Sequence, residues 1–545
     1  MKTQSKAAKY FQCLTPVLVL NLKNYNRHKL LKDIISGLIV GIISLPLSLA
    51  LAIASGAPPE VGLITAIMGG GIAALFSGSR FQVSGPTAAF IPIVLKIATD
   101  CGPEGFLAAI FLAGIILLIM GFLKLGKLIN YISLPIVAGF TAGIAVSIFT
   151  GQLADFMGYT GKVPKEFFEK LYFYAVNIGT VNIYAIIIGV ACVAIMLVMP
   201  KINKKIPGAL VAIVFAVLIQ VIFKPDIETI GSRFGELQLK FRIRRLDFSK
   251  MGIIIMPAVS IALLAAIESL LSAKAADSMT KTLHNPNAEL ISQGVANISS
   301  SLFGGLPVTG AIARTSANIK NGGVTPLSTV VHALFLLFVG LVLMPLATLI
   351  PLTALSAVLI VVCKNMVNIK EAKKIMASTR RDIILFFTAL TLTVIFDLVV
   401  AILSGMVLAL LSVLIQFIIA KSNKRDYRLS VDVTDDGKLM TVTVNGALNF
   451  ITDARFKLEY QSEAKEVLID IHNAFDLDLQ GYMVIKEVVK RMLSEGRAVK
   501  VIGSERSIHC LYRINYDNKD KIDLTDILVE QSMLTFSNGS NEKKA

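Results

Sequence analysis

The sequence predicts a polytopic α-helical membrane protein followed by a cytoplasmic α/β domain. Of its 545 residues, 54% are apolar and only 17% are charged, and the mean hydropathy is +0.71. A soluble protein would carry about a quarter charged residues. Windows such as 34–54 are nearly free of charge and are long enough to cross a bilayer as helices. After residue 421 the apolar runs end and short alternating segments begin.

The apolar windows predict about fourteen crossings, of which two are short. The two short segments, 87–98 and 309–320, each follow a Gly/Pro break. The other windows are 34–54, 60–77, 104–124, 130–149, 178–199, 206–223, 253–273, 290–303, 327–349, 352–363, 382–398 and 400–420.

Basic residues predict the topology in a cell (inner) membrane. The N-terminal segment 1–33 is rich in Lys, which places it in the cytoplasm, and an even number of crossings returns the C-terminus to the same side. The basic stretch 224–251 falls outside on this count, where it could attract anions. The net charge of +16 is explained by cytoplasmic loops that face anionic lipid, without nucleic acid as a partner.

The last part of the chain is expected to form a small soluble domain. Residues 422–429 are a polar linker, and the segment 430–537 alternates strands and a helix. The strands are read from VDVTDDGKLMTVTVNGAL, VLIDIHNA and AVKVIG, and the amphipathic helix from Tyr482 to Leu493. Residues 538–545 are expected to be disordered.

Two Gly/Pro breaks share one pattern, FQVSGPTAAFIP at 81–92 and FGGLPVTGAIARTS at 303–316. Each occupies the third span of its half, so the transmembrane domain 34–421 divides into repeats at about 34–223 and 253–421. Paired interrupted spans are typical of inverted-repeat secondary transporters, although single breaks are more often packing kinks. Half-helices that begin at mid-membrane would direct unpaired N–H groups at an anion. Pro86 is expected near the first helical position, with Thr87, Ala88, Ala311 and Ile312 at the two tips.

One carboxylate lies inside an apolar window. Glu268 needs a proton, a cation or a hydrogen-bonding partner there, and Ser272 follows it at i+4 on the same helix face. It is either a site of proton or Na⁺ coupling or a structural ligand of a broken helix. Arg314 is either its charge partner or an attractor for the anion. Neither a catalytic triad, a phosphate-binding GxxxxGK loop nor a metal cluster is present in the sequence, so we expect no enzyme and no cofactor.

These motifs together resemble the sulfate permease (SulP) family of anion transporters, which includes prestin and the animal multifunctional anion exchangers. The resemblance rests on DIISGLIVGIISLPLSLALAIASGAPPEVGL, GSRFQVSGPTAAF, ESLLSAKAADSMT and HNPNAELISQGVANISSSLFGGLPVTGAIARTSANIKNGG. It implies a seven-plus-seven inverted repeat with core and gate domains, like the uracil transporter. It also implies a homodimer, elevator-type transport and a C-terminal STAS domain at 430–537.

The resemblance also implies the site residues. The anion site would comprise Leu47, Leu51, Thr87, Ala88, Ala311, Ile312, Ala313 and Arg314. Cation or proton coupling would involve Glu268, Ser272 and Gly310, with Na⁺ at Glu268 as one option.

Four positions depart from the family pattern. Leu47 stands where many relatives have Gln. A cyanobacterial bicarbonate transporter has Asp in place of Glu268 and Thr in place of Ile312, which favours proton over Na⁺ coupling. In the STAS segment, Leu479 stands where related soluble domains carry a phosphorylatable Ser, so scaffolding or binding of a cytoplasmic partner is expected instead of phosphoswitching.

The sequence therefore predicts a secondary active transporter of sulfate, bicarbonate or a dicarboxylate, coupled to protons or Na⁺. An uncoupled anion exchanger or anion channel is the alternative, because the fold does not decide between them. A sensor that acts through the STAS domain is a third hypothesis, which leaves the paired breaks without a role.

Overall fold

The computed structural model describes residues 15–22, 25–126, 133–159, 163–164, 166–203, 206–395, 398–423, 426–452, 456 and 464–515. The first fourteen residues, the predicted end of the α/β domain at 516–537 and the predicted tail at 538–545 lie outside these described residues. The chain forms two compact units. One comprises Met1–Ile129, Gly143–Met366 and Val394–Val399, and the other Asn130–Ala142, Val367–Thr393 and Val400–Ala545.

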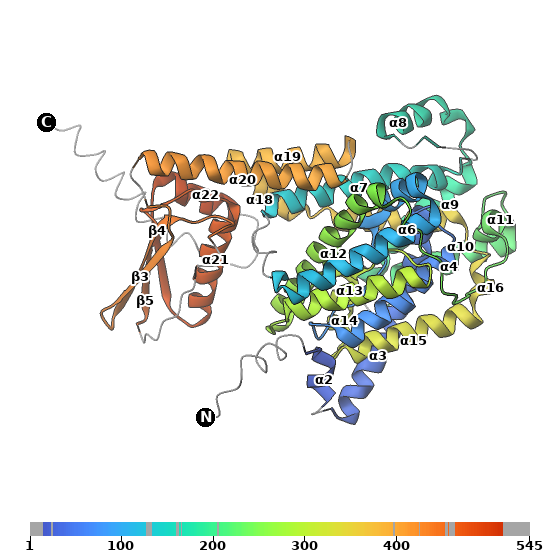
Figure 1. The fold of residues 1–545 in the computed structure, drawn as a ribbon, viewed down its shortest axis with the longest axis horizontal. Coiled ribbons are helices and arrows are strands. Elements are labelled where there is room, and N and C mark those ends of the chain that lie inside the picture. Colours follow the sequence, from blue (N-terminus) through green and yellow to red (C-terminus); the bar gives the residue numbers. More distant parts are fainter. Residues whose placement is uncertain are drawn as a thin grey trace. The chain divides into compact units, whose positions relative to one another are not determined.

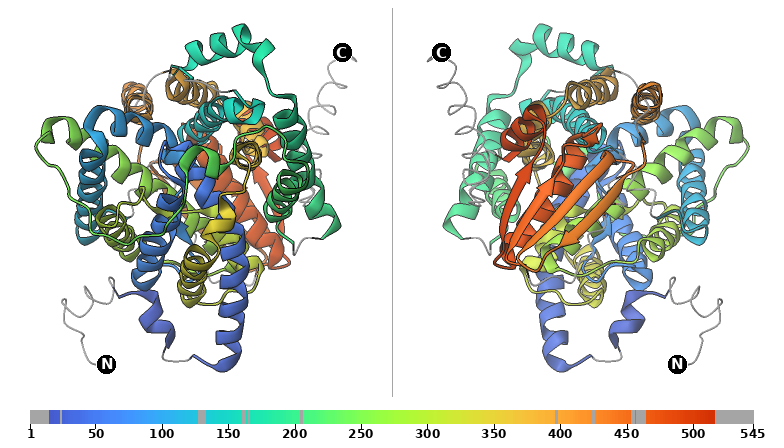
Figure 2. Two further views of the ribbon diagram at one scale, coloured as in Figure 1. Left: turned by 90° about the vertical axis from the view of Figure 1, so that its right-hand side faces the viewer. Right: turned by 90° about the vertical axis from the view of Figure 1, so that its left-hand side faces the viewer.

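The first unit is helical apart from two very short strands (Figures 1 and 2). Seven helical runs of the described chain are long and apolar enough to cross a membrane, and Gly208–Phe223, Leu327–Val342 and Leu410–Ser422 are shorter apolar helices. The elements are α2 (Val17–Leu22), α3 (Arg27–Ala54), α4 (Pro59–Ile64), η1 (Thr65–Gly70), α5 (Gly71–Phe76), β1 (Ser84–Gly85), η2 (Ala88–Phe90), α6 (Ile91–Phe122), α7 (Leu134–Met157), α8 (Phe167–Val176), η4 (Ile178–Thr180), α9 (Ile183–Ile202), α10 (Gly208–Phe223), α11 (Ile230–Phe234), α12 (Met251–Thr280), α13 (Pro286–Leu302), β2 (Thr309–Gly310), α14 (Ile312–Lys320), α15 (Leu327–Val342), α16 (Met344–Ala347) and α17 (Leu352–Met366). The beginning of α7 belongs to the second unit.

Helix α6 contains the boundary between two predicted spans. Its hydrogen bonds run from Ile91 to Phe122, but Gly102 has φ 74° and ψ 175°, outside the helical region, and Pro103 follows. A positive φ is accessible to Gly at little steric cost. The two predicted segments 87–98 and 104–124 are therefore two helices that meet at a kink.

Three sequence-based expectations need correction. The segment predicted as a helix from 309 begins at Ile312, because Thr309 and Gly310 pair as a strand. Helix α13 starts at Pro286 rather than at 290, and its buried face is polar. Pro86 precedes the helical turn at Ala88–Phe90 rather than occupying its first position. The short helices α8 and α11 were not predicted.

The second unit contains the predicted α/β segment together with helices that precede it. Its helices are α18 (Ile369–Ala377), most of α19 (Arg380–Ile395), α20 (Leu398–Ser422), α21 (Leu479–Ser494) and α22 (Glu505–Asn515). Its strands are β3 (Ser430–Asp435), β4 (Leu439–Ala447), β5 (Glu466–Asp470), β6 (Ala474–Phe475) and β7 (Ala498–Ile502). Helix α18 was not predicted, whereas the strands and α21 lie where the sequence places them.

The sheet of the second unit has the order β3-β4-β5-β7, and β6 pairs with β4 (Figure 2). β3 and β4 are antiparallel, whereas β5 runs parallel to both β4 and β7. Alternate residues of the strands enter one apolar core with α21, as shown by Val442, Ile469, Val501 and Ile485, which are all buried. The C-terminal part of the chain is thus a mixed α/β fold.

Candidate functional site

The two Gly/Pro breaks of the sequence meet in the first unit as an antiparallel strand pair. Ser84 pairs with Gly310, and Gly85 pairs with Thr309. On the helical side of this pair, the amide of Ala311 donates to the carbonyl of Val83 at 3.0 Å. The pairing holds the start of η2–α6 and the start of α14 next to each other, although more than 220 residues separate them in sequence.

Glycine is required on both strands because neighbouring atoms approach the backbone closely. A Cβ on Gly310 would lie 1.9 Å from Nε2 of Gln82, and one on Gly85 would lie 2.6 Å from Nη1 of Arg314. A Cβ on Gly70, at the end of the π-helical turn η1, would lie 2.5 Å from the carbonyl oxygen of Ser84. Contacts below 3.0 Å force a neighbour to move. The β1–β2 strand pair, called the strand crossing below, therefore depends on glycines from three segments of the chain.

Both helical segments begin without a side-chain cap. Thr87, before η2, and Ala311, before α14, have extended backbones, and neither position has a side-chain capping hydrogen bond. The first N–H groups of a helix have no partner within the helix. At the tip of α14, Ile312 is 50% exposed and Ala313 is also exposed. These uncapped starts can offer hydrogen-bond donors and the positive end of the helix dipole to an anion.

Glu268 reaches one of these helix starts from α12. The hydroxyl of Thr87 donates to Oε2 of Glu268 at 3.0 Å. Glu268 is half-buried, and within the described residues it forms no ion pair with Arg314. Glu268 thus lies within the apolar helix α12, and its carboxylate reaches the start of η2.

Arg314 makes its described hydrogen bond with the backbone beside the strand pair. Its side chain is 2% exposed, and Nη2 donates to the carbonyl of Pro86 at 2.5 Å. Nε and Nη1 are buried without a hydrogen-bond partner among the described residues. Arg314 therefore stabilises the backbone next to the β1–β2 pair, and its positive charge lies close to the start of η2.

The remaining predicted residues occupy supporting positions. The hydroxyl of Ser272 donates to Thr315 at 3.2 Å rather than to Glu268, and Thr315 in turn accepts from the amide of Val83 at 3.1 Å. Ala88 is buried at the start of η2. Leu47 is half-buried and Leu51 is buried on α3, which packs against α14. The link of Leu47 and Leu51 to the helix starts rests on the resemblance.

Sequence reasoning missed a second buried carboxylate that supports the crossing. Glu289 on α13 is fully buried and accepts hydrogen bonds from Ser77, the amide of Gly78, Gln82 and Gln293 at 2.7–3.1 Å. Gln293 also donates to Ser84 at 2.9 Å, and so links α13 to β1. The signal was present in the sequence, because Glu289, Gln293 and Asn297 recur every four residues and so share one helix face.

Residues 30–389 match the sulfate permease family. The chain is 43% identical over 392 residues to the putative sulfate transporter YvdB of Bacillus subtilis, covering 71% of this chain and 74% of that protein. It is 29% identical over 501 residues to the bicarbonate transporter BicA of Picosynechococcus, covering 87% of this chain and 88% of that protein.

Solved structures give the same picture. The transmembrane domain of a cyanobacterial bicarbonate transporter BicA superposes with a TM-score of 0.64 at 30% identity, covering 69% of this chain and 98% of that one. Murine Slc26a9, an anion transporter in the inward-facing state, superposes with a TM-score of 0.70 over 98% of this chain and 93% of that one, at 17% identity, which speaks to the fold alone. The chain belongs to the sulfate permease family, and is a multi-pass membrane transporter of anions rather than an enzyme.

Proposed function

We propose that this chain is a secondary active transporter of sulfate, bicarbonate or a small dicarboxylate, which binds the anion between the starts of η2–α6 and α14. One observation carries the proposal. The β1–β2 pairing holds two uncapped helix starts together, and Thr87 links one of them to Glu268. The site comprises Leu47, Leu51, Thr87, Ala88, Ala311, Ile312 and Ala313, with Arg314 behind it and with Glu268, Ser272 and Gly310 on the coupling side.

The unpaired amides of the helix starts replace part of the water that the anion loses. Such donors are fixed by the backbone, so they need no reorganisation when the anion binds. Arg314 is buried and forms no ion pair with a carboxylate among the described residues, so a bound anion would help to offset the charge of its guanidinium. The apolar Leu47, Leu51 and Ile312 favour release, because they add no charged contact to the anion.

Glu268 takes up the coupling cation. An ionised carboxylate at membrane depth is costly unless a proton or a cation accompanies it. Its described side-chain hydrogen bond comes from the hydroxyl of Thr87. Uptake of a proton, or of Na⁺ as the second option, would neutralise Glu268 and offset the charge of the anion that moves with it.

The arrangement proposed from the family is a seven-plus-seven inverted repeat that works as a homodimer. A core domain carrying both helix starts moves past a gate domain in an elevator mechanism, with both termini in the cytoplasm. Residues 430–537 form a STAS domain on this proposal. The mixed sheet of β3, β4, β5 and β7 supports the last point.

Purified protein in liposomes tests the proposal. Labelled sulfate, bicarbonate and succinate are offered with and without an inward pH gradient and with and without a Na⁺ gradient. We expect uptake of at least one anion, driven by the pH gradient and accompanied by proton entry. Uptake that ignores both gradients but depends on an internal anion would identify the chain as an uncoupled exchanger. A conductance far above carrier turnover would identify it as a channel.

A further inference from the structure

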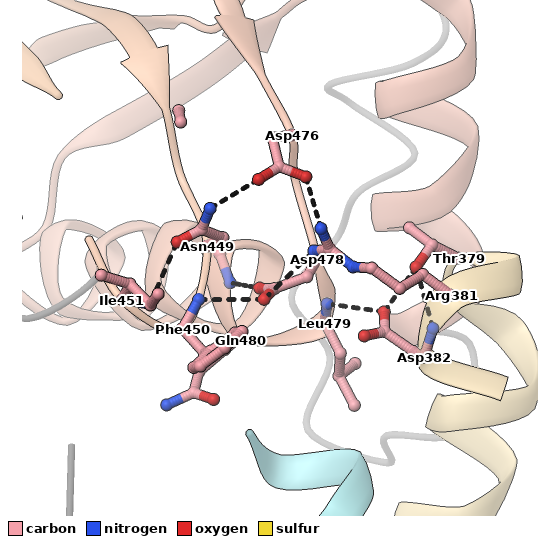
Figure 3. Close-up of polar contacts among 12 residues, drawn as sticks. Thr379, Arg381, Asp382, Asn449, Phe450, Ile451, Asp476, Asp478, Leu479 and Gln480 are labelled. Atoms are coloured by element: carbon pink, nitrogen blue, oxygen red, sulfur yellow. Dashed lines mark hydrogen bonds and ion pairs between the residues drawn. The ribbon is translucent and has the colours of Figure 1, made fainter. Parts of the chain in front are cut away.

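The first turn of α19 and the start of α21 share a cluster of charged side chains within the second unit (Figure 3). Arg381 on α19 pairs with Oδ1 of Asp476 at 2.5 Å and lies 3.4 Å from Oδ2 of Asp478. Next to Arg381, Asp382 accepts the amide of Leu479 at 3.0 Å. Three acidic side chains and one guanidinium therefore connect a helix of the predicted membrane region to the α/β fold.

Asp478 is the structural centre of this cluster. Its side chain is 3% exposed, and it caps α21 by accepting the amide of Gly481 at 2.9 Å. Its second oxygen accepts the amide of Phe450 at 2.9 Å. Asp382 is 1% exposed and accepts the hydroxyl of Thr379 at 2.8 Å in addition to the amide of Leu479. The buried carboxyl groups of Asp382 and Asp478 thus both accept backbone amides from the first turn of α21.

The charges of the cluster do not balance when all three carboxyl groups are ionised. Asp476 receives the short contact from Arg381, together with hydrogen bonds from Tyr427 and Asn449 at 2.6 Å each. Asp478 is left with the longer contact from Arg381 and with neutral donors, and the described hydrogen bonds to Asp382 come from neutral donors.

The neighbouring charges come from α18. A cavity of about 210 Å³ beside Leu479 is lined by Lys370, Glu371 and Lys374, together with Leu134, Asn368 and Met483. Two lysines and one glutamate leave one positive charge at this wall.

We propose that Asp478 binds a proton beside the carboxylate of Asp382, and that this proton fastens the α/β fold to α19 and lets it loosen when the proton leaves. Proton loss places two like charges in a buried space, where their repulsion is strong. The ligand of the site is a proton from the cytoplasm, and the response is a change in attachment rather than the transport step itself.

The direction of the effect follows from linkage. Burial, and next the charge of Asp382, raise the pKa of Asp478 from 3.8 to about 7. The attached state therefore binds the proton more tightly than a detached, solvated carboxyl group does. Between the pKa of a solvated carboxyl group and pH 7 only the attached state holds the proton, so attachment weakens as the pH rises through this range, by up to about tenfold for each pH unit for one proton, and levels off above pH 7.

Hydrogen exchange of the full-length protein in lipid nanodiscs tests the proposal. Exchange of peptides that contain Phe450 and Leu479 is followed by mass spectrometry between pH 5 and 8.5, and the intrinsic base catalysis is subtracted. We expect the corrected exchange of both amides to rise by up to about tenfold per pH unit as the pH increases towards 7, and to level off above pH 7. D478N should flatten this rise and D382N should move it to lower pH, whereas D432N, at an exposed carboxylate that pairs with Asn445, should leave it unchanged.

A flat wild-type profile would overturn the proposal, and so would a rise that persists in D478N or that D382N leaves at the same pH. D478N also removes a helix cap, so general exchange throughout β4 and β5 would show that this variant is misfolded. In that case D382N alone decides, because it leaves the cap of α21 intact.

Discussion

The hydroxyl of Thr87 donates a 3.0 Å hydrogen bond to the carboxylate of Glu268 and so joins the start of η2–α6 to helix α12. In the loaded state Glu268 is neutral, and a hydrogen bond between neutral groups contributes about 0.5–1.5 kcal/mol, or roughly two- to tenfold in affinity. T87V keeps the side-chain shape and removes the donor that holds the start of η2 in place. We expect T87V to raise the anion KM by up to about tenfold, whereas T87S keeps it near wild type. Initial rates of labelled anion uptake measure both. Equal KM values for T87V and T87S would show that the hydroxyl of Thr87 does not contribute to anion binding.

Glu268 is the group on which coupling depends. E268Q removes the negative charge but keeps a polar side chain of the same size. We expect E268Q to abolish the concentrative uptake driven by a pH gradient and to retain anion exchange, because the permanently neutral side chain mimics the loaded state. E268D keeps the carboxyl group and should retain coupling at a lower rate. Gradient-driven uptake that survives in E268Q would assign coupling to another residue.

Gly310 tests the strand crossing itself. A Cβ at this position would lie 1.9 Å from Nε2 of Gln82, whose side chain is buried and hydrogen-bonded to Ser269 and Glu289. Overpacking of this kind costs about 1–3 kcal/mol, so G310A should lower the melting temperature and abolish transport. G252A in α12 is the matched control, because no neighbouring atom lies within 4 Å of its Cβ. Transport by G310A at the wild-type rate would contradict the geometry of the crossing.

Glu289 is predicted to act in stability rather than in transport. E289A removes the acceptor of three buried N–H groups, from Gly78, Gln82 and Gln293, and each unsatisfied group costs about 1–3 kcal/mol, whereas the hydroxyl of Ser77 keeps the carbonyl of Ser79 as an acceptor. We expect a loss of several degrees in the melting temperature of E289A in detergent, larger than that of E236A at an exposed glutamate. A melting temperature equal to that of E236A would show that the buried donors find other partners.

Arg381 is predicted to set the pH range of the attachment between α19 and the α/β fold. Its positive charge lowers the pKa of Asp478 in opposition to burial and Asp382. R381Q removes this contribution, so Asp478 should hold its proton to higher pH, while the lost pairing with Asp476 weakens the attachment at every pH. The pH profile of hydrogen exchange at Leu479 measures both effects. A profile identical to wild type would show that Arg381 affects neither the pKa of Asp478 nor the attachment.

The sequence was sufficient to predict the elements that local pattern controls. The paired breaks, the helix starts near Thr87 and Ala311 and the strands from Ser430 to Ile502 follow from Gly/Pro placement and from alternation. The sequence placed Pro86 near the first helical position, whereas the helical turn begins two residues later at Ala88. The backbone of Thr87 is extended because β1 pairs with β2 just before it.

Contacts between distant segments could not be read from the sequence. Arg381 and Asp476 are 95 residues apart, and Arg314 meets Pro86 across 228 residues. The direction of the Arg314 side chain depends on the close approach of Gly85, which only the folded crossing creates. The buried role of Glu289 likewise depends on donors contributed by three separate segments.

A structure of the full-length protein with a transported anion bound tests the central claim most directly. The account predicts density for the anion within hydrogen-bonding distance of amides at both helix starts, near Thr87–Ala88 and Ile312–Ala313. Density that lies against the Arg314 guanidinium alone, or away from both helix starts, would contradict it.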